Sequence, residues 1–434
     1  MILASTAQVW RKRLTQGMVK DSAIYVAGEL LSKAVPFVLL PYLTRQLGVA
    51  GFGALAFYTA VSAFLLIFIS LSQNAAITRY YYVYGKHGLG NVVLAGALLS
   101  VGLWAVVACG LVVAGKLLGN QLSLNTQLLG YSTLLALGQS LVQSQLAVRQ
   151  CQKRAWDYLA LQLLLATSNV GLTVMFFATM TAGHVADGAD DQVAARLLAI
   201  VLAQAITACL AWLLMRMRLG IRLSWRKRRL WLAMRYIVAL GLPLVLHALS
   251  YTLKGQLDRV WVYQRFSAAE LGVYAAGVQL AGAVSVVIMA VNSAAVPYLY
   301  EAFKARRVSI ARLHRWGLMS LLLAPIAAGV VWLLPRSLFG WLLGAAFADS
   351  QYYVACFTAA FMLLVPYLLW VNVLFYHGKN RQIAAASVCS TLVYVAVLAY
   401  TSNLALMWVP LATLASNAVL LPLLYHLTKR IEPA

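Results

Sequence analysis

Glu29 and Lys33 are the residues of this sequence best placed to do chemistry, because both are ionisable and both lie inside an otherwise apolar stretch. They are four positions apart and therefore share one face of a helix, about 10 and 16 Å from its start. An ionisable side chain in mid-membrane costs about 2.5 to 3.5 kcal/mol to insert, so it should face a wet cavity or a partner. The two residues form either a structural ion pair or part of a substrate site, and both interpretations hold if the pair opens on binding.

A second group of polar residues lies in the apolar stretch 237–263, which contains His247, Lys254, Asp258 and Arg259. Lys254 either faces a cavity or extends its ammonium group to the membrane surface. Asp258 and Arg259 are typical of a helix-end cap and anchor, with a cavity role as the alternative. His247 lies at mid-depth, where a single histidine either packs with a hydrogen bond or carries protons.

Arg79 ends the second apolar stretch, where it serves as an interface anchor or as a further cation of a cavity. With the six residues above, it completes the set of candidate substrate-binding residues, and no residue is predicted to be catalytic. No cofactor is predicted. Coupling to protons, through Glu29 and His247, or to sodium, through backbone carbonyls, is left open.

The sequence predicts no metal site. The five cysteines are scattered without C-x-x-C spacing and suit packing positions. The longest polar loop, from Thr181, carries Asp187, Asp190 and Asp191 without a convincing set of further ligands. We therefore expect a solvated loop there.

Apolar stretches of about 20 residues, the length needed to cross a bilayer, must position these side chains. The chain is 63% hydrophobic and 10% charged, which excludes a soluble protein. The predicted fold is all-α and polytopic. The twelve predicted helices lie near 22–44, 52–76, 91–114, 128–148, 158–180, 193–215, 237–263, 271–298, 316–334, 351–376, 383–402 and 405–427.

The positive charges set the predicted orientation. Most of the 34 Lys and Arg fall in the N-terminal segment and in every second loop after it, which places both termini in the cytoplasm. The same alternation argues against nucleic acid as the partner of a chain with net charge +23. No cleavable signal peptide is expected, because the basic N-terminal segment leads into a full-length span. The densest basic segment, 216–235, is predicted to lie on anionic lipid, and a docking site for an enzyme is the alternative.

An ungapped internal repeat relates the two halves of the chain. The sequence from Gly51 aligns with the sequence from Glu270 at a constant offset, so that Gly53 pairs with Gly272 and Tyr81 with Tyr300. Coincidence between lipid-facing helices is the alternative, since small and apolar residues recur in all such helices. The repeat predicts two six-helix lobes, 1–220 and 221–434, related by an axis along the membrane normal. Bends are expected at five prolines: Pro36, Pro41, Pro243, Pro325 and Pro366.

Three segments resemble the Wzx-type polysaccharide flippases, members of the superfamily that also contains multidrug exporters. They are PFVLLPYLTRQLGVAGFGALAFY from Pro36, LDRVWVYQRFSAAELGVYAAG from Leu257 and LFGWLLGAAFADS from Leu338. The resemblance extends in order and topology over nearly the whole chain. It implies a MATE-like fold and movement of an undecaprenyl-diphosphate-linked oligosaccharide from the inner to the outer leaflet of the bacterial inner membrane.

The residues agree with the resemblance on one point. Lys33, Lys254 and Arg79 supply cations that bind the oxygens of a diphosphate. The resemblance also implies a polysaccharide polymerase and the chain-length machinery as partners, and a role in O-antigen and lipopolysaccharide synthesis.

Two other functions are alternatives. An ion-coupled multidrug exporter of the same fold would need acids in its cavity, and Glu29 is the one clearly intramembrane acid. A membrane glycosyltransferase or polysaccharide polymerase would need carboxylates or arginines on a sizeable outer loop, whereas the first outer loop has about six residues. We therefore predict a transporter and no enzyme.

Overall fold

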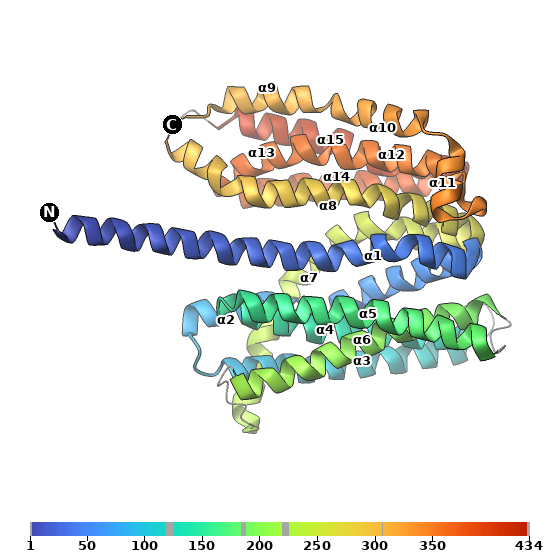
Figure 1. Ribbon diagram of the computed structural model, residues 1–434, viewed down its shortest axis with the longest axis horizontal. Coiled ribbons are helices and arrows are strands. Elements are labelled where there is room, and N and C mark those ends of the chain that lie inside the picture. Colours follow the sequence, from blue (N-terminus) through green and yellow to red (C-terminus); the bar gives the residue numbers. More distant parts are fainter. Residues whose placement is uncertain (1, 119–124, 184–187, 219–224, 306, 432–434) are drawn as a thin grey trace. The chain divides into compact units, whose positions relative to one another are not determined.

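The protein is helical throughout the part of the chain that the structure describes. The computed structural model describes residues 2–118, 125–183, 188–218, 225–305 and 307–431 (Figure 1). No strand occurs among these residues. The helices are α1 (Ile2–Ser70), α2 (Gln73–Tyr84), α3 (Leu89–Leu118), α4 (Thr126–Cys151), α5 (Ala155–Gly183), α6 (Ala189–Arg218), α7 (Lys227–Arg265), α8 (Ala268–Lys304), α9 (Ile310–Ser320), α10 (Leu323–Leu333), α11 (Arg336–Leu343), α12 (Ser350–Met362), α13 (Leu364–Tyr376), α14 (Asn380–Thr401) and α15 (Leu411–Lys429), with the 3₁₀ turns η2 (Ala345–Phe347) and η3 (Leu406–Trp408).

Ten helical stretches of the described residues are long and apolar enough to cross a membrane. The first, Ile24–Tyr84, contains two helices of α1 that meet at Gly48, where φ is 62°. Glycine suits this turn because a side chain strains a positive φ. The helix α4 is not among the ten, because glutamine, serine and threonine residues lower its apolarity. The run predicted at 128–148 is therefore a helix as expected, but a more polar one.

Two predicted spans are divided by short breaks, and each break precedes a proline. The span 316–334 consists of α9 and α10, and Pro325 lies in the first turn of α10. The span 351–376 consists of α12 and α13, and Pro366 lies in the first turn of α13. Proline suits a first turn, where its missing N–H has no intrahelical partner. The expected bends are thus present at both prolines.

The chain forms two compact units. Unit 1 contains Met1–Val35, Phe64–His184 and Ala194–Leu246, and unit 2 contains Pro36–Ala63, Val185–Val193 and His247–Ala434. The predicted lobe boundary at residue 220 stays a prediction, because these units are groups of contacting residues and not sequence halves.

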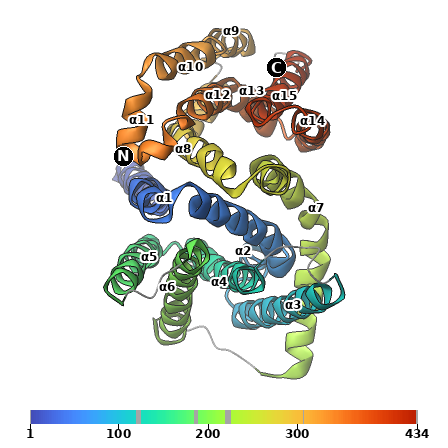
Figure 2. The same cartoon turned by 90° about the vertical axis from the view of Figure 1, so that its right-hand side faces the viewer.

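Unit 1 is built around α4, which contacts α2, α3 and α5. Its apolar core joins α2, α3, α4, α6 and the start of α7, and includes Ile77, Val93, Val148, Met215 and Ile237. These helices lie side by side in Figure 2. Burial of one face of α4 in this core leaves its opposite, polar face available for a cavity.

Unit 2 contains the predicted repeat contact. A Cβ added to Gly53 would collide with the carbonyl oxygen of Ala268, and one added to Gly272 would collide with the carbonyl oxygen of Val49. Val49 and Ala268 occupy equivalent positions of the repeat, as do Gly53 and Gly272. A reciprocal contact of this kind is the property of a two-fold axis. The second helix of α1 and α8 therefore contact each other reciprocally through equivalent positions of the predicted repeat.

Candidate functional site

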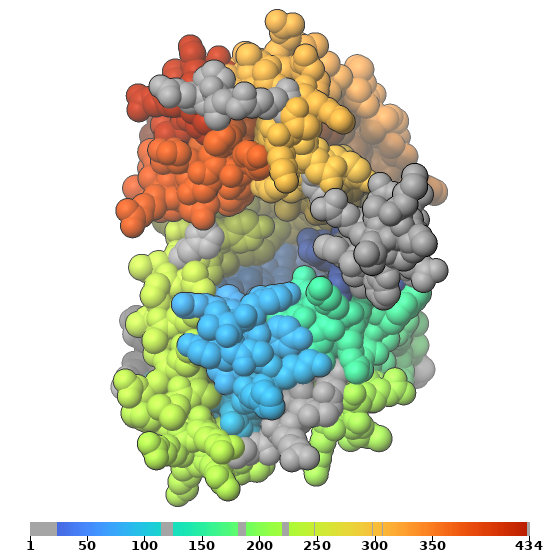
Figure 3. Space-filling model, turned by 90° about the vertical axis from the view of Figure 1, so that its left-hand side faces the viewer, coloured from blue at the N-terminus to red at the C-terminus, as the bar shows by residue number. Residues whose placement is uncertain are grey.

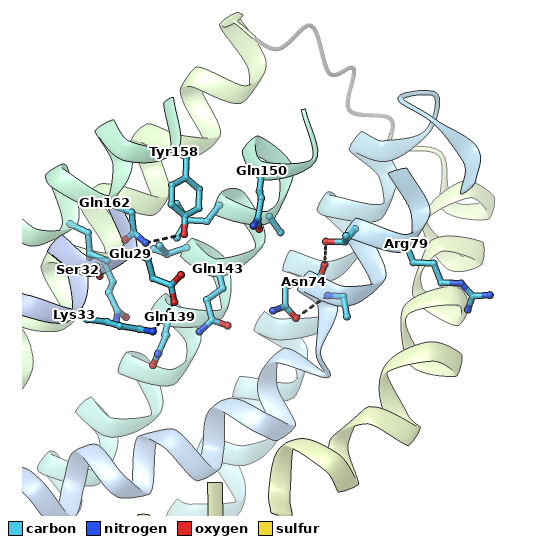
Figure 4. A pocket seen from close by; sticks show the side chains of 17 residues that line it. Glu29, Ser32, Lys33, Asn74, Arg79, Gln139, Gln143, Gln150, Tyr158 and Gln162 are labelled. Atoms are coloured by element: carbon cyan, nitrogen blue, oxygen red, sulfur yellow. Dashed lines mark hydrogen bonds and ion pairs between the residues drawn. The ribbon is translucent and has the colours of Figure 1, made fainter. Parts of the chain in front are cut away.

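Unit 1 contains a cavity of about 840 Å³ between α1, α2, α4, α5 and α6. Cavities of a few hundred to 1,000 Å³ with convergent polar groups are typical binding sites. Its polar lining residues are Glu29, Ser32, Lys33, Asn74, Thr78, Arg79, Gln139, Gln143, Gln150, Tyr158, Gln162 and Gln204 (Figure 4). The lining thus combines two cations, one acid and many amide and hydroxyl groups. It is built to hold a polar ligand.

Glu29 and Lys33 form an ion pair in this cavity, with 2.7 Å between Lys33 Nζ and Glu29 Oε1. The two side chains are 56% and 47% exposed, respectively, so water or a ligand reaches both. An exposed pair of this spacing contributes only about 0.3 to 0.5 kcal/mol to stability. Because an ammonium group has three donors, Lys33 keeps donors for a ligand while paired.

The polar face of α4 is the part of the site that sequence reasoning missed. Gln139, Gln143 and Gln150 line the cavity, and Gln139 and Gln143 extend towards the ion pair in Figure 4. Steps of four and seven residues place side chains on one face of a helix. That spacing in an otherwise apolar helix is the signal that identifies them. Each amide offers donors and an acceptor, the groups that bind sugar hydroxyls.

The helix α2 contributes Asn74, Thr78 and Arg79 to the lining. The Thr78 hydroxyl donates to the Asn74 carbonyl oxygen at 2.9 Å. In Figure 4 the guanidinium of Arg79 points away from the pair of Glu29 and Lys33. Arg79 thus borders the cavity with its stem, and its charge lies at the margin.

A break in the second span sets the orientation of α2. Leu71 and Ser72 have φ values of 43° and 50°, although no proline lies nearby. The buried Gln73 side chain donates to Ser100 Oγ at 3.0 Å and to Ser140 Oγ at 2.5 Å. The backbone at Leu71 lies directly against Gly241 of α7, where a Cβ would collide with the Leu71 carbonyl oxygen. The break starts α2 beside the cavity.

Three of the predicted site residues lie in unit 2 and not in this cavity. Lys254 Nζ donates to Ser390 Oγ of α14 at 2.6 Å. Asp258 is 5% exposed and lies about 10 Å before the end of α7, so it is not at the helix terminus. Arg259 donates to the Gly255 carbonyl oxygen at 3.2 Å. Their predicted substrate role stays a prediction.

The other predicted positions are His247 and the acids of the loop from Thr181. The side chain of His247 and the residue Asp187 lie outside the described residues. Asp190 and Asp191 are exposed in the first turn of α6. Among the described residues, no group of three or more His, Cys, Asp or Glu side chains is arranged to hold a metal ion.

Two arginines of unit 1 are buried, and neither forms an ion pair with a described residue. Arg149 donates to the carbonyl oxygen of Ala211 at 2.8 Å and to Gln145 Oε1 at 3.0 Å. Arg196 donates to Asn169 Oδ1 at 2.6 Å and to Thr173 Oγ1 at 2.5 Å. Both are tied to neutral acceptors of neighbouring helices, so they join helices and were not recognisable as buried from the sequence.

Comparison with known proteins gives relatives and a shared fold. The family model described as polysaccharide biosynthesis protein matches residues 18–303. Protein 1 of the Lsg locus of Haemophilus influenzae is 39% identical over 95% of this chain and 98% of its own length. A MATE transporter of Vibrio cholerae in a bent form gives a TM-score of 0.59 at 15% identity, over 96% of this chain and 98% of that one. An inward-facing multidrug resistance transporter of the MATE family gives a TM-score of 0.61 at 15% identity, over 94% and 92%.

The apolar helices and the fold define a multi-pass membrane protein with the fold of the MATE transporters. The chain belongs to the polysaccharide biosynthesis protein family, because the family model covers more than half of it. The predicted resemblance to this group and the predicted MATE-like fold are confirmed.

Proposed function

We propose that the protein moves an undecaprenyl-diphosphate-linked oligosaccharide from the inner to the outer leaflet of the bacterial inner membrane, by alternating access through the cavity of unit 1. The observation that carries the proposal is the lining of that cavity, where cations and amides occur together. Lysine and arginine bind diphosphate oxygens with charge-assisted hydrogen bonds. Glutamines and a tyrosine provide the donors and acceptors that sugar hydroxyls require.

The charge of the cavity favours this cargo over a cationic drug. Glu29 is the one acid of the lining, and Lys33 already neutralises it. The ion pair leaves the cavity without an acid to hold a cation, and the one unpaired charge of the lining is that of Arg79 at the margin, which attracts an anion. An ion-coupled multidrug exporter is therefore the weaker proposal. A glycosyltransferase or polymerase is weaker still, because the fold is that of transporters.

The proposed orientation places both termini in the cytoplasm, with the start of α7 on anionic lipid of the inner face. Trp231 of α7 is 54% exposed, and the Arg235 guanidinium lies 4.6 Å from the centre of its ring. The start of α7 and the turn between α2 and α3 are adjacent on the face drawn in Figure 3. Arg229 and three tyrosines line a pocket of about 420 Å³ between them. Such basic and aromatic segments suit the headgroup region. A polymerase and chain-length machinery are proposed partners at the outer face.

The experiment is a leaflet assay in a host strain that lacks the gene. A membrane-impermeant sugar-modifying enzyme reports how much lipid-linked oligosaccharide is on each leaflet. We expect inner-leaflet accumulation in the deletion strain, relief by the wild-type gene, and a transport loss of at least tenfold in Lys33→Gln. Lys86→Gln is the matched control, because Lys86 is exposed in the turn after α2 and does not line the cavity.

Two results would count against the proposal. Normal transport by Lys33→Gln at normal abundance would show that transport does not need the Lys33 charge in the cavity. Normal export in the deletion strain, together with altered drug sensitivity, would favour the multidrug exporter.

A further inference from the structure

Asp258 is the one acidic side chain among the buried residues of the described part, with 5% of its surface exposed. It lies in α7, and its neighbours come from α8 and α14, so the whole group belongs to unit 2. A buried ionisable residue inside a membrane protein is costly unless it is paired or functional. Its surroundings therefore decide which of the two applies.

The groups around the carboxyl are neutral hydrogen-bond donors. Tyr274 Oη donates to Asp258 Oδ2 at 2.5 Å, and the backbone N–H of Arg259 donates to Oδ1 at 2.9 Å. Tyr394 of α14 also interacts with Asp258, both with its carboxyl and with its backbone. Tyr274 and Tyr394 are each 1% exposed. The carboxyl thus lies between two buried phenols.

The nearby cations direct their hydrogen bonds elsewhere, so the charge of Arg259 acts on the Asp258 carboxyl without a direct ion pair. The Arg259 guanidinium donates to the Gly255 carbonyl oxygen and to the Gln256 side chain. Lys254, one turn before Asp258 on α7, donates to Ser390, which in turn contacts Ser416 at 2.8 Å. None of the ion pairs formed by described residues includes Asp258. An ionised carboxylate buried without a counter-charge costs several kcal/mol, whereas the neutral acid does not.

We propose that Asp258 is a proton-binding site, protonated in this conformation, whose proton is exchanged with water during each transport cycle. When the contact between α7, α8 and α14 opens, the O–H bond of the carboxyl breaks, water accepts the proton as hydronium, and a carboxylate remains. Lys254, four positions before Asp258 on the same helix face, is the cation that then pairs with it, in exchange for Ser390. The bound proton thus selects between two arrangements of α7 on α14.

The protonation state is testable without any transport assay. Infrared spectroscopy of the purified protein in lipid detects the carbonyl stretch of a protonated carboxyl at neutral pH. We expect this band in the wild type and in Asp349→Asn, whose acid is 80% exposed beside Arg336, and its loss in Asp258→Asn. Absence of the band from the wild type, or its persistence in Asp258→Asn, would overturn the proposal.

A second variant guards against misfolding of Asp258→Asn. Tyr274→Phe keeps the ring that packs in unit 2 but removes the hydroxyl that donates to Asp258. A carbonyl that loses a hydrogen bond stretches at higher frequency, so we expect the band to shift upwards. The control Tyr300→Phe changes a tyrosine of α8 that contacts Tyr376 instead and should leave the band in place. An unshifted band in Tyr274→Phe would show that the observed carboxyl is not Asp258.

The link to transport rests on the proposed function and has its own readout. In proteoliposomes, an imposed pH gradient should accelerate movement of lipid-linked oligosaccharide several-fold in the wild type. Asp258→Asn should carry the cargo at one rate, with or without the gradient. Gradient-dependent transport by Asp258→Asn would refute the coupling. If the wild type moves no such cargo, the proposed function fails, and the infrared band still decides whether Asp258 binds a proton.

Discussion

Alanine at Gly53 or Gly272 should destabilise the protein, and by similar amounts. Each added Cβ would collide with a backbone carbonyl oxygen, of Ala268 in one case and of Val49 in the other. Backbone cannot rotate away as a side chain does, so the helices must separate. Overpacking of this kind costs about 1 to 3 kcal/mol. Replacing glycine by alanine within a helix also stabilises the helix, by up to about 1 kcal/mol.

The expected net loss for Gly53→Ala or Gly272→Ala is therefore about 1 to 2 kcal/mol. For a folding unit of about 200 residues, each 1 kcal/mol corresponds to about 2 to 4 °C. Thermal unfolding of the detergent-solubilised protein, followed by size-exclusion chromatography of the heated sample, should show a midpoint lower by about 4 °C. The double variant should cost less than the sum of the two single variants, because one helix separation relieves both collisions.

Gly171→Ala is the matched control, because nothing lies within 4 Å of a Cβ at Gly171 of α5. Its midpoint should be unchanged or higher. A wild-type midpoint for Gly53→Ala would refute the close crossing. A large loss in only one of Gly53→Ala and Gly272→Ala would refute its two-fold symmetry.

Three further results are expected. Gln143→Ala should lower the transport rate several-fold in the leaflet assay, because its amide lines the cavity, but should change the free energy of unfolding by less than about 0.5 kcal/mol. An unchanged rate would show that this face of α4 is not part of the site. Arg149→Met should cost about 1 to 3 kcal/mol in the thermal assay, because it leaves the buried amide oxygen of Gln145 without its donor, whereas Arg154→Met, at an exposed ion pair, should cost less than about 1 kcal/mol. Gly241→Ala should also lower the midpoint by a few degrees, since its Cβ would meet the backbone of Leu71, and an unaffected midpoint would show that the break in the second span needs no close approach of α7.

Part of the site followed from the sequence. The spacing of Glu29 and Lys33 predicted their ion pair, because residues four apart on a helix are neighbours whatever surrounds the helix. The glutamines of α4 carried an equally local signal, in the spacing of Gln139, Gln143 and Gln150. The sequence prediction does not include it, because the apolar residues of this stretch alone predict a span.

Other residues gave no local signal. The break at Leu71 and Ser72 has no proline, and depends on contacts of Gln73 with α3 and α4. Asp258 looked like a helix-end cap in the sequence, whereas α7 continues beyond it and two other helices bury it. Burial depends on which helices are neighbours, and a sequence window does not contain that information.

The sequence by itself determined the membrane-spanning helices, the ion pair and the repeat. Every backbone polar group in a bilayer must bond within its own segment, so length and apolarity suffice to predict a span. The tertiary structure decided which polar faces enclose a cavity and which charges are buried. It also showed that the repeat glycines Gly53 and Gly272 meet, because such contacts join residues far apart in the chain.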